Sequence, residues 1–314
     1  MNNSEDKHFT LVSIAMASYN GEKYIDEQID SLIKQDYYPI EIIIVDDNST
    51  DDTWEKLRHW QSKYPNIIKI FRNKENVGFN QNFAKAFSLC KGKYIAVSDQ
   101  DDVWVSSKIT TLIKIFEKDP DIMLIHHKDD HIIDNKLYKQ ERDKYYWKPY
   151  LGNNPKPLFL TYRIGGHSIV FNSDIIPSLL PIPNGILYDW WLLMIALSKG
   201  KIDYCNDDLV HFRFHPDSTH FGNKDRDKNK VHDIDHALTL FNTIQEYKNE
   251  DKLFLKKFSN VFHMHVIKHK GKFDWRLFLF FVRYRRTFFK VIDGPNRLLT
   301  EIFRLRLCRV YAKI

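Results

Sequence analysis

Short apolar runs alternate with amphipathic segments along the first 126 residues of the chain. The apolar runs are rich in β-branched residues, which predicts strands at 10–17, 40–47, 66–73, 94–99 and 121–127. The segments between them place apolar residues at helical spacing, which predicts helices at 22–35, 49–61, 80–92 and 107–119. Alternating strands and helices form α/β folds, so we expect a mostly parallel sheet covered by helices on both faces.

The alternation stops near residue 222, where the sign of the charge also changes. Residues 222–314 carry 21 Lys and Arg against 10 Asp and Glu, a net charge of +11, whereas residues 1–221 have a net charge of −5. The 314 residues are enough for one large α/β domain and an appendage. We therefore expect an α/β domain over 1–221 and a basic helical region over 222–314.

Cysteine usage and hydropathy indicate the compartment. The cysteines Cys90, Cys205 and Cys308 lie far apart without a CxxC pair, so neither a zinc site nor a disulfide framework is expected. The N-terminal residues are polar and lack the apolar core of a signal peptide. The longest apolar run, 277–282, is far too short to cross a bilayer. These features predict a cytoplasmic protein.

The strands predicted at 40–47 and 94–99 both end in acidic residues. These residues are Asp46, Asp47, Asp99, Asp101 and Asp102. Ligands of parallel sheets bind beyond the carboxyl ends of the strands. Carboxylates this close repel one another unless a cation or a hydrogen-bond donor faces them. The two strand ends are therefore candidate parts of a ligand site.

Helix capping is the alternative explanation of such acids. A side-chain oxygen before a helix accepts a hydrogen bond from a backbone N–H in its first turn. We expect this role for Asp51 and Asp52, and also for Asp102. For Asp46 and Asp47, capping and ligand binding both stay open.

Asp99 and Asp101 form an Asp-x-Asp pair that can hold one hard cation. Mg2+ and Mn2+ prefer oxygen ligands and accept one or two protein carboxylates while phosphate oxygens fill other positions. A cation held in this way neutralises a diphosphate leaving group, as breaking a sugar–phosphate bond requires. The pair alone is a weak signal, and it gains weight from the motifs around it.

Several blocks of the chain resemble the family 2 glycosyltransferases, whose catalytic domain has the Rossmann-like GT-A fold. They are VSIAMASYNGEKYIDEQIDSLIKQDYYPIEIIIVDDNSTDDT (12–53), NVGFNQNFAKAFSLCKGKYIAVSDQDDVW (76–104), GGHSIVFN (165–172), YDWWLLMIALSKGKI (188–202) and LVHFRFHPDS (209–218). Their order and spacing are those of the family. The chain is most similar to bacterial enzymes that build surface polysaccharides, such as rhamnosyltransferases. The resemblance implies an inverting transfer of a sugar from a nucleotide-diphosphate sugar to a saccharide acceptor.

The resemblance also implies which residues bind the nucleotide. The backbone at Ala17 and the ring of Tyr19 match positions that border the base, and Glu22 matches a position near the ribose. Asp47 matches the acid that accepts a hydrogen bond from the imide N–H of the base. Ala17 stands where the family often has Thr.

The resemblance likewise implies which residues bind the diphosphate and its cation. Asp99 matches the acid that faces the ribose and donor sugar, and Asp101 matches the metal ligand, so we expect Mn2+ or Mg2+ here. Arg213 and His215 match an Arg-x-His element near the diphosphate. The forked donors of Arg suit phosphate. His215 is a candidate ligand of the metal or phosphate, with a surface histidine as the alternative.

Asp189 is the candidate general base. Inverting transfer needs a group that takes the proton of the acceptor hydroxyl as its oxygen attacks the anomeric carbon, and a carboxylate suffices. Asp189 opens an apolar helix between aromatic residues, where simple capping is the alternative. The family places its catalytic Asp here, often as Glu-Asp, whereas this chain has Tyr188 before it.

Other positions are expected near the donor sugar or the acceptor. Gly165 and Gly166 allow close approach of the backbone, with a tight turn as the alternative, and Trp190 follows the candidate base. The segment 130–164 is expected to be the variable loop that faces the acceptor.

The segment 276–290 predicts a helix with two different faces. Its cations fall within about 80° of one another on a helical wheel, and they are Arg276, Arg283, Arg286 and Lys290. The opposite side carries Leu277, Phe281, Tyr284 and Phe288. Such a helix suits an anionic membrane surface, which would fit a lipid-linked saccharide acceptor; a helix packed on the domain is the alternative. The segment 296–311 is also rich in Arg, but its apolar residues spread around the wheel. No nucleic-acid-binding motif is present.

Three rival functions compete with this interpretation. A haloacid-dehalogenase-type phosphatase needs Thr or Ser close behind its aspartates, but Val103 and Trp104 follow here. A dehydrogenase needs G-x-G-x-x-G after the first strand, where this chain has a single glycine. A nucleotide-sugar or polyanion-binding protein of the same fold, without turnover, stays open.

Overall fold

The structure is a computed structural model that describes residues 10–133, 136–139, 148–216, 226–269, 272–292 and 297–313. The boundary expected at 221–222 and part of the loop expected to face the acceptor lie outside these ranges. The chain divides into two compact units. The first contains Met1–Tyr138, Gly165–Ile182 and Cys205–Arg213, and the second contains Lys139–Ile164, Pro183–Tyr204 and Phe214–Ile314.

The first unit is built on one sheet. Its strands are β1 (Val12–Ser18), β2 (Ile40–Asp46), β3 (Ile68–Arg72), β4 (Tyr94–Ser98), β5 (Val103–Trp104), β6 (Ile122–Ile133), β7 (Lys136–Tyr138), β8 (Ile169–Asn172) and β9 (Lys201–Phe214). Among the described residues their order is β3-β2-β1-β4-β8-β6-β9-β5, with β7 beside β6. The strands from β3 to β4 run parallel, whereas β8 is antiparallel to both β4 and β6.

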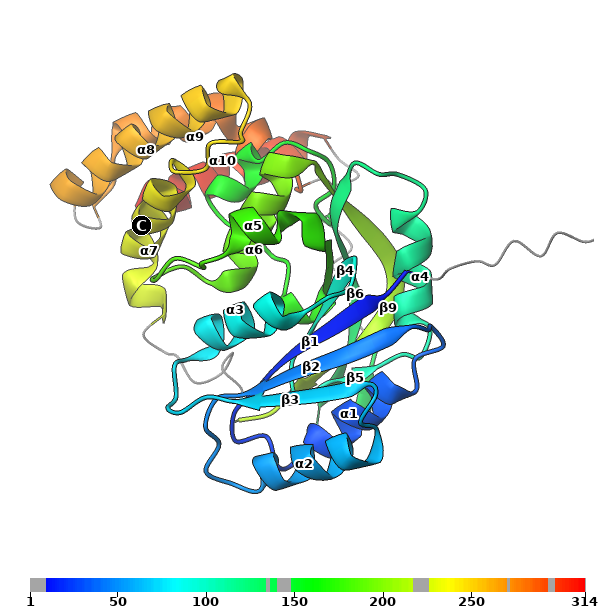
Figure 1. Cartoon of the computed structure of the whole chain (residues 1–314). Coiled ribbons are helices and arrows are strands. Elements are labelled where there is room, and N and C mark those ends of the chain that lie inside the picture. The colour runs from blue at the N-terminus through cyan, green and yellow to red at the C-terminus, as the bar shows by residue number, and fades with distance from the viewer. Residues whose placement is uncertain are drawn as a thin grey trace, which may run out of the picture. The chain divides into compact units, whose positions relative to one another are not determined.

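Helices cover both faces of the parallel strands. They are α1 (Ile25–Ile33), α2 (Thr53–Lys63), α3 (Phe79–Leu89) and α4 (Lys108–Phe116), followed by the short η2 (Gly166–Ser168), η3 (Ser173–Ile175) and α5 (Ile176–Leu179). In Figure 1, α3 lies on one side of β1 and β2, and α1 and α2 lie on the other. The α/β fold expected from the hydrophobic pattern is therefore confirmed.

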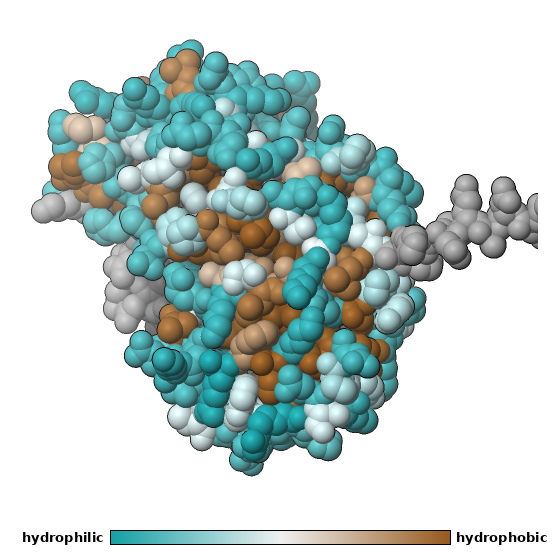
Figure 2. Space-filling view, in the orientation of Figure 1, coloured by the Kyte–Doolittle hydropathy of each residue, from teal (hydrophilic) through white to brown (hydrophobic). Residues whose placement is uncertain are grey.

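The core of this unit lies between the sheet and its helices. All seven residues of β2 are buried, as expected for a strand covered on both faces. One of them is charged: Glu41 accepts hydrogen bonds from Ser13 Oγ at 2.7 Å, Lys69 Nζ at 2.6 Å and the backbone N–H of Lys91 at 2.7 Å. Figure 2 shows hydrophobic residues over β1–β3 and mainly hydrophilic ones on α1 and α2.

The second unit is mainly helical. Its helices are η1 (Lys156–Phe159), α6 (Tyr188–Lys199), α7 (Arg226–Phe241), α8 (Asn249–His269), α9 (Trp275–Phe288) and α10 (Arg297–Tyr311). The predicted basic helix is α9, which contacts η1, α8 and α10. Its apolar side is buried among aromatic rings; the buried residues are Leu277, Phe280, Phe281 and Phe288. The aromatic face of α9 is thus used for packing within this unit. No helix in the described ranges has the length and apolar character needed to cross a bilayer.

Candidate active site

Three parallel strands of the first unit end side by side. Ser18 at the end of β1 lies opposite Asp46 of β2, and Met16 lies opposite Ser98, the last residue of β4. The carboxyl ends of parallel strands form the usual ligand edge of an α/β sheet. This register brings to one edge the residues that follow the strands: Tyr19, Asp47 and Asp99.

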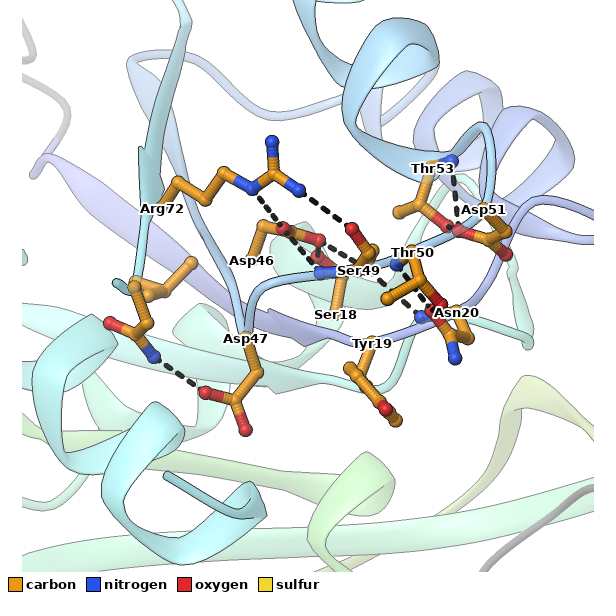
Figure 3. Close-up of polar contacts among 12 residues, drawn as sticks. Ser18, Tyr19, Asn20, Asp46, Asp47, Ser49, Thr50, Asp51, Thr53 and Arg72 are labelled. Atoms are coloured by element: carbon orange, nitrogen blue, oxygen red, sulfur yellow. Dashed lines mark hydrogen bonds and ion pairs between the residues drawn. The ribbon is translucent and has the colours of Figure 1, made fainter. Parts of the chain in front are cut away.

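Asp46 is held entirely by groups of the protein. Its buried carboxylate accepts hydrogen bonds from the backbone N–H of Ser49 at 3.0 Å and from Ser18 Oγ at 3.3 Å. Arg72 Nε forms an ion pair with it at 3.3 Å. In Figure 3 the carboxylate points toward Arg72 and Ser49, whereas Asp47 points to the other side. Asp46 therefore stabilises the turn after β2 and does not cap a helix.

Asp47 organises the loop between β3 and α3. Its Oδ1 accepts hydrogen bonds from Asn73 Nδ2 at 2.7 Å and from the backbone N–H of Val77 at 2.9 Å. Its Oδ2 accepts from the backbone N–H of Gly78 at 2.8 Å, and Gly78 has φ +83°, which favours glycine. The carboxylate is buried.

A side-chain amide joins the loops that follow β1 and β4. Gln100 Oε1 accepts the backbone N–H of Tyr19 at 2.9 Å, and its Nε2 donates to the carbonyl of Tyr19 at 3.0 Å. The close approach requires Gly21, because a Cβ there would lie 2.3 Å from Gln100 Oε1. The ring of Tyr19 stays 44% exposed, and half-buried Ala17 precedes it on β1. Both residues expected to border the base thus lie at this edge.

Glu22, in the loop after β1, contacts the residues that lead into α2. Its Oε2 accepts the backbone N–H of Asp52 at 3.0 Å, and its own N–H donates to Asp51 Oδ2 at 3.1 Å. Asp51 Oδ1 in turn accepts the N–H of Thr53, the first residue of α2. The capping role expected for Asp51 is confirmed, whereas Asp52 occupies the N-cap position without a side-chain bond.

Asp102 does not cap the helix after it, which corrects our expectation. Helix α4 begins at Lys108 with Ser107 at the N-cap, and Asp102 Oδ1 instead accepts the backbone N–H of Arg213 at 3.0 Å. The carboxyl group is fully buried, and within the described ranges no hydrogen-bond donor reaches Oδ2. Burial raises the pKa of Asp102 well above its ordinary value, and the nearby charges of Asp101 and Asp99 add to this effect.

A group able to hold a metal ion lies at this strand end. Asp99, Asp102 and His167 each place a ligand atom within 4.8 Å of the others. Burial lowers the pKa of His167, but the hydrogen bond with Asp129 and the charge of Asp102 outweigh it, so the pKa is raised. Two carboxylates and an imidazole are a donor set that suits a divalent cation.

Lys108 supplies a buried cation behind these acids. Its Nζ donates to the carbonyl of His167 at 2.9 Å and lies 3.5 Å from the centroid of the Trp104 ring. Burial lowers the pKa of Lys108 well below its ordinary value, against the attraction of Asp102 and Asp99. The lysine links the start of α4 to η2 and so fixes the turn that carries His167.

Arg213 fixes the Asp-x-Asp turn from behind. Its Nε donates to the carbonyl of Asp101 at 2.9 Å, its guanidinium pairs with Glu27 at 2.5 Å, and the guanidinium carbon lies 4.9 Å from the ring centroid of Tyr24. The side chain is 6% exposed. The structure thus brings Asp99, Asp101 and Arg213 together.

The two glycines of the GGHS motif form a turn. The carbonyl of Gly165 accepts hydrogen bonds from the backbone N–H of Ser168 at 3.1 Å and from its Oγ at 2.8 Å. Gly166 opens η2. A Cβ on Gly165 would lie 2.6 Å from the ring of His167, so the turn reading of the motif is confirmed and the glycine makes room for the imidazole.

Asp189 lies in the second unit, in the first turn of α6. Its Oδ1 accepts hydrogen bonds from Tyr162 Oη at 2.6 Å and from the backbone N–H of Trp190 at 2.8 Å. Trp190 is buried, donates to the carbonyl of Leu158 at 2.8 Å and stacks on Tyr162. His215, half-buried, follows β9. The roles given to these residues stay predictions.

Sequence reasoning missed Gln100, Lys108 and His167 in the first unit, and Tyr162 beside Asp189 in the second. Gln100 stands between the two acids of the Asp-x-Asp pair, and His167 directly follows the paired glycines, so both lay inside quoted motifs. Lys108 and Tyr162 gave no signal, because a lysine in the first turn of a helix and a tyrosine in a loop are ordinary surface residues in sequence.

Known proteins resemble the chain in sequence. The chain matches the family model described as glycosyl transferase family 2 over residues 13–176. An uncharacterized glycosyltransferase of Rickettsia prowazekii is 31% identical over 252 residues, which covers 79% of this chain and 72% of the relative. An uncharacterized protein of Mycobacterium tuberculosis is 28% identical over 207 residues, which covers 65% of this chain and 59% of that protein, less than two thirds of its length.

Solved structures share the fold at low sequence identity. TarS of S. aureus in complex with UDP-GlcNAc has a TM-score of 0.59 at 15% identity, covering 97% of this chain and 89% of that one. The mannosyltransferase PcManGT of Pyrobaculum calidifontis, in complex with GDP-Man and Mn2+, has a TM-score of 0.58 at 15% identity, covering 98% and 88%. These likenesses confirm the GT-A fold. Together with the family match, they show that the chain belongs to glycosyltransferase family 2.

Proposed function

We propose that the protein transfers a sugar from a nucleotide-diphosphate sugar to a saccharide acceptor, with inversion at the anomeric carbon. The observation that carries the proposal is the shared sheet edge at which Tyr19, Asp47 and Asp99 follow three adjacent parallel strands. The named contents of the solved neighbours, UDP-GlcNAc and GDP-Man, support a donor of this class.

The nucleotide base binds between Tyr19 and Asp47. A carboxylate has about four acceptor positions, and loop donors use three of those of Asp47. One position is left for the imide N–H of the base. Ala17 borders the base through its backbone, and Glu22 lies on the ribose side.

A divalent cation, Mn2+ or Mg2+, binds at the end of β4. The family pattern assigns it to Asp99 and Asp101 with His215, and the geometry of the first unit offers Asp99 with Asp102 and His167. When bound, the cation offsets the negative charge of the departing nucleotide diphosphate. Arg213 holds the carbonyl of Asp101 and thereby keeps the ligand turn in place beside the diphosphate.

Asp189 takes the proton of the acceptor hydroxyl. The short bond from Tyr162 fixes the orientation of its carboxylate, as general base catalysis requires. Gly165, Gly166 and Trp190 lie near the donor sugar or the acceptor in this proposal.

The acceptor is a lipid-linked saccharide of bacterial surface polysaccharide synthesis, such as O-antigen or capsule. The protein then works at the inner face of the cytoplasmic membrane as a peripheral protein. The net charge of +11 over residues 222–314 supports this placement, because the cytoplasmic leaflet is anionic.

The first experiment is a donor screen. Purified protein is heated with UDP-, dTDP- and GDP-sugars, with Mn2+, with Mg2+ or with a chelator. A donor at about 100 times its Kd should stabilise the fold by about 2.7 kcal/mol. Stabilisation by one donor that depends on the cation is expected; failure of every donor to shift the melting temperature would sink the proposal.

The second experiment separates an enzyme from the remaining alternative, a donor-binding protein without turnover. Asp189→Ala should keep the donor-induced stabilisation while transfer falls by about 100-fold or more. Asp203→Ala is the matched control, because Asp203 is a half-buried acid of the same unit whose carboxylate accepts only the adjacent N–H of Tyr204 among the described contacts. Transfer that survives in Asp189→Ala would remove this residue from the mechanism.

The same screen identifies the metal ligands. Asp101→Asn and Asp102→Asn are compared for Mn2+-dependent stabilisation by the donor. If only Asp101→Asn loses the Mn2+-dependent stabilisation, the cation is assigned to the Asp-x-Asp pair. If only Asp102→Asn loses this stabilisation, the cation is assigned to the group that contains His167.

A further inference from the structure

The outward face of α10 carries exposed aliphatic side chains together with cations. The aliphatic residues are Leu298, Leu299, Ile302, Leu305 and Val310, with exposed fractions from 39% to 68%. The exposed cations on the same side are Arg306, Arg309 and Lys313. Large aliphatic side chains are rarely this exposed in a row on one helix of a soluble protein.

The opposite face of α10 is fixed to α9, which lies beside it (Figure 1). Tyr311 and Cys308 are buried, and the ring of Tyr311 packs against Phe281 and Phe289 with centroids 6.1 and 5.8 Å apart. Packing on α9 therefore determines which face of α10 points outward. The core-facing side of α10 is already buried, and the exposed aliphatic residues lie on its other side.

The acid of α10 faces inward. Glu301 is the single acid among residues 297–313, and it forms ion pairs with Arg285 at 2.8 Å, Arg286 at 3.1 Å and Arg304 at 2.8 Å. These pairs neutralise Glu301 at the contact with α9. The outward face consequently carries cations without an acid.

We propose that this face of α10 is the surface that docks on an anionic lipid membrane. Aliphatic residues at the first turns would enter the acyl boundary, while the cations of the last turns would lie at the phosphate groups. A symmetric contact between two copies of this face would bring its cations together. The inference refines the membrane partner of the proposed function and moves it from α9, whose aromatic face is buried, to α10.

The test is co-flotation of the full chain with vesicles. One set is phosphatidylcholine, and the other also contains phosphatidylglycerol. Wild-type protein should float with the anionic vesicles, and added salt should release it, because exposed charges are screened. Flotation with neither set, or equally with both, would overturn the proposal.

Two double substitutions separate the contributions of the aliphatic and the cationic side chains to membrane binding. Ile302→Gln with Leu305→Gln should lower the partition coefficient about tenfold or more, because two aliphatic side chains no longer enter the bilayer. Arg306→Gln with Arg309→Gln should lower it on the order of tenfold and flatten the salt dependence. Leu253→Gln is the matched control: this residue of α8 is 72% exposed, and its loss should leave flotation unchanged.

Donor-induced stabilisation is measured on the same variants. It should stay at the wild-type value, since α10 carries none of the proposed donor ligands. Flotation lost with donor binding intact supports the docking surface. Donor binding without flotation of the wild type sinks this inference alone, and flotation without donor binding sinks the proposed function alone. Concentration-dependent dimerisation abolished by Ile302→Gln would assign the face to a second copy and overturn the proposal.

Discussion

Two acidic strand ends of the same sheet differ in how their carboxylates are used. At the end of β2, Asp46 is surrounded by Ser18, Ser49 and Arg72, and Asp47 accepts three hydrogen bonds from the next loop. At the end of β4, buried Asp102 keeps one oxygen that no donor reaches within the described part of the chain.

The difference separates acids whose carboxylates are held by several protein donors from an acid with one oxygen that no described donor reaches. A buried carboxylate satisfied by protein donors stabilises the fold, and its loss leaves those donors without partners. A buried carboxylate oxygen without a donor costs free energy, so folding alone gives no reason to keep it. Substitutions at the two ends should therefore act in opposite ways on stability.

The largest effect is expected for Asp46→Ala. The substitution leaves Ser18, Ser49 and Arg72 without their acceptor, so the free energy of unfolding should fall by about 3 kcal/mol. Urea denaturation followed by circular dichroism measures the change. Asp174→Ala is the control, because that carboxylate is 63% exposed and pairs only with exposed Lys93 among the described contacts; its loss should cost less than about 0.5 kcal/mol.

Asp47→Asn should have the next largest effect. The amide keeps one acceptor oxygen, but its NH2 group faces a backbone N–H of the loop. We expect a loss of about 1–2 kcal/mol in the same assay. An unchanged urea midpoint would mean that the loop bonds to Asp47 contribute nothing, and the contrast between the strand ends would weaken.

The pH dependence of stability tests the structural role of Glu41. Burial raises its pKa, but hydrogen bonds from Lys69, Ser13 and the N–H of Lys91 lower it by more, so the net shift is downward. A lowered pKa gives stability that is present above pH 4.5, the ordinary value, and is lost as the pH falls below it. Glu41→Gln should cost about 1 kcal/mol at neutral pH.

The difference between Glu41→Gln and the wild type should shrink as the pH falls below 4.5. Urea midpoints of both proteins at several pH values measure it. A difference that stays constant across the range would show that the charge of Glu41 contributes nothing to stability.

Asp102→Asn should change stability least. The amide oxygen can still accept the N–H of Arg213, and only the oxygen that no described donor reaches is replaced. The free energy of unfolding should stay within about 1 kcal/mol of the wild type, or rise. A loss as large as that of Asp46→Ala would place Asp102 with the structural acids and break the comparison.

The fold and the strand ends could be predicted from the sequence, because both follow from local patterns. β-branched runs marked β2 and β4, and the acids after them marked the ligand edge. The use of each acid could not be predicted in this way. The donors to Asp46 and Asp102 come from Arg72 and Arg213, and only the folded chain brings such distant residues together.

Long-range packing also decided what the sequence left open at the C-terminus. The wheel of 276–290 had a clear apolar face, and that face proved to be internal to its unit. The wheel of 296–311 looked unsorted, because it mixes residues that pack on α9 with aliphatic residues that are exposed. A helical wheel shows which residues share a face of a helix. It gives no information on which face packs against a neighbouring helix.

The bridge from Gln100 to Tyr19 constrains how this family can vary. An amide at position 100 accepts the backbone N–H of Tyr19 and donates to the carbonyl of the same residue, which glutamate of the same shape cannot do. The bridge also needs a bare α-carbon at position 21. Across related sequences, a side chain at position 21 and a long amide at position 100 should exclude each other.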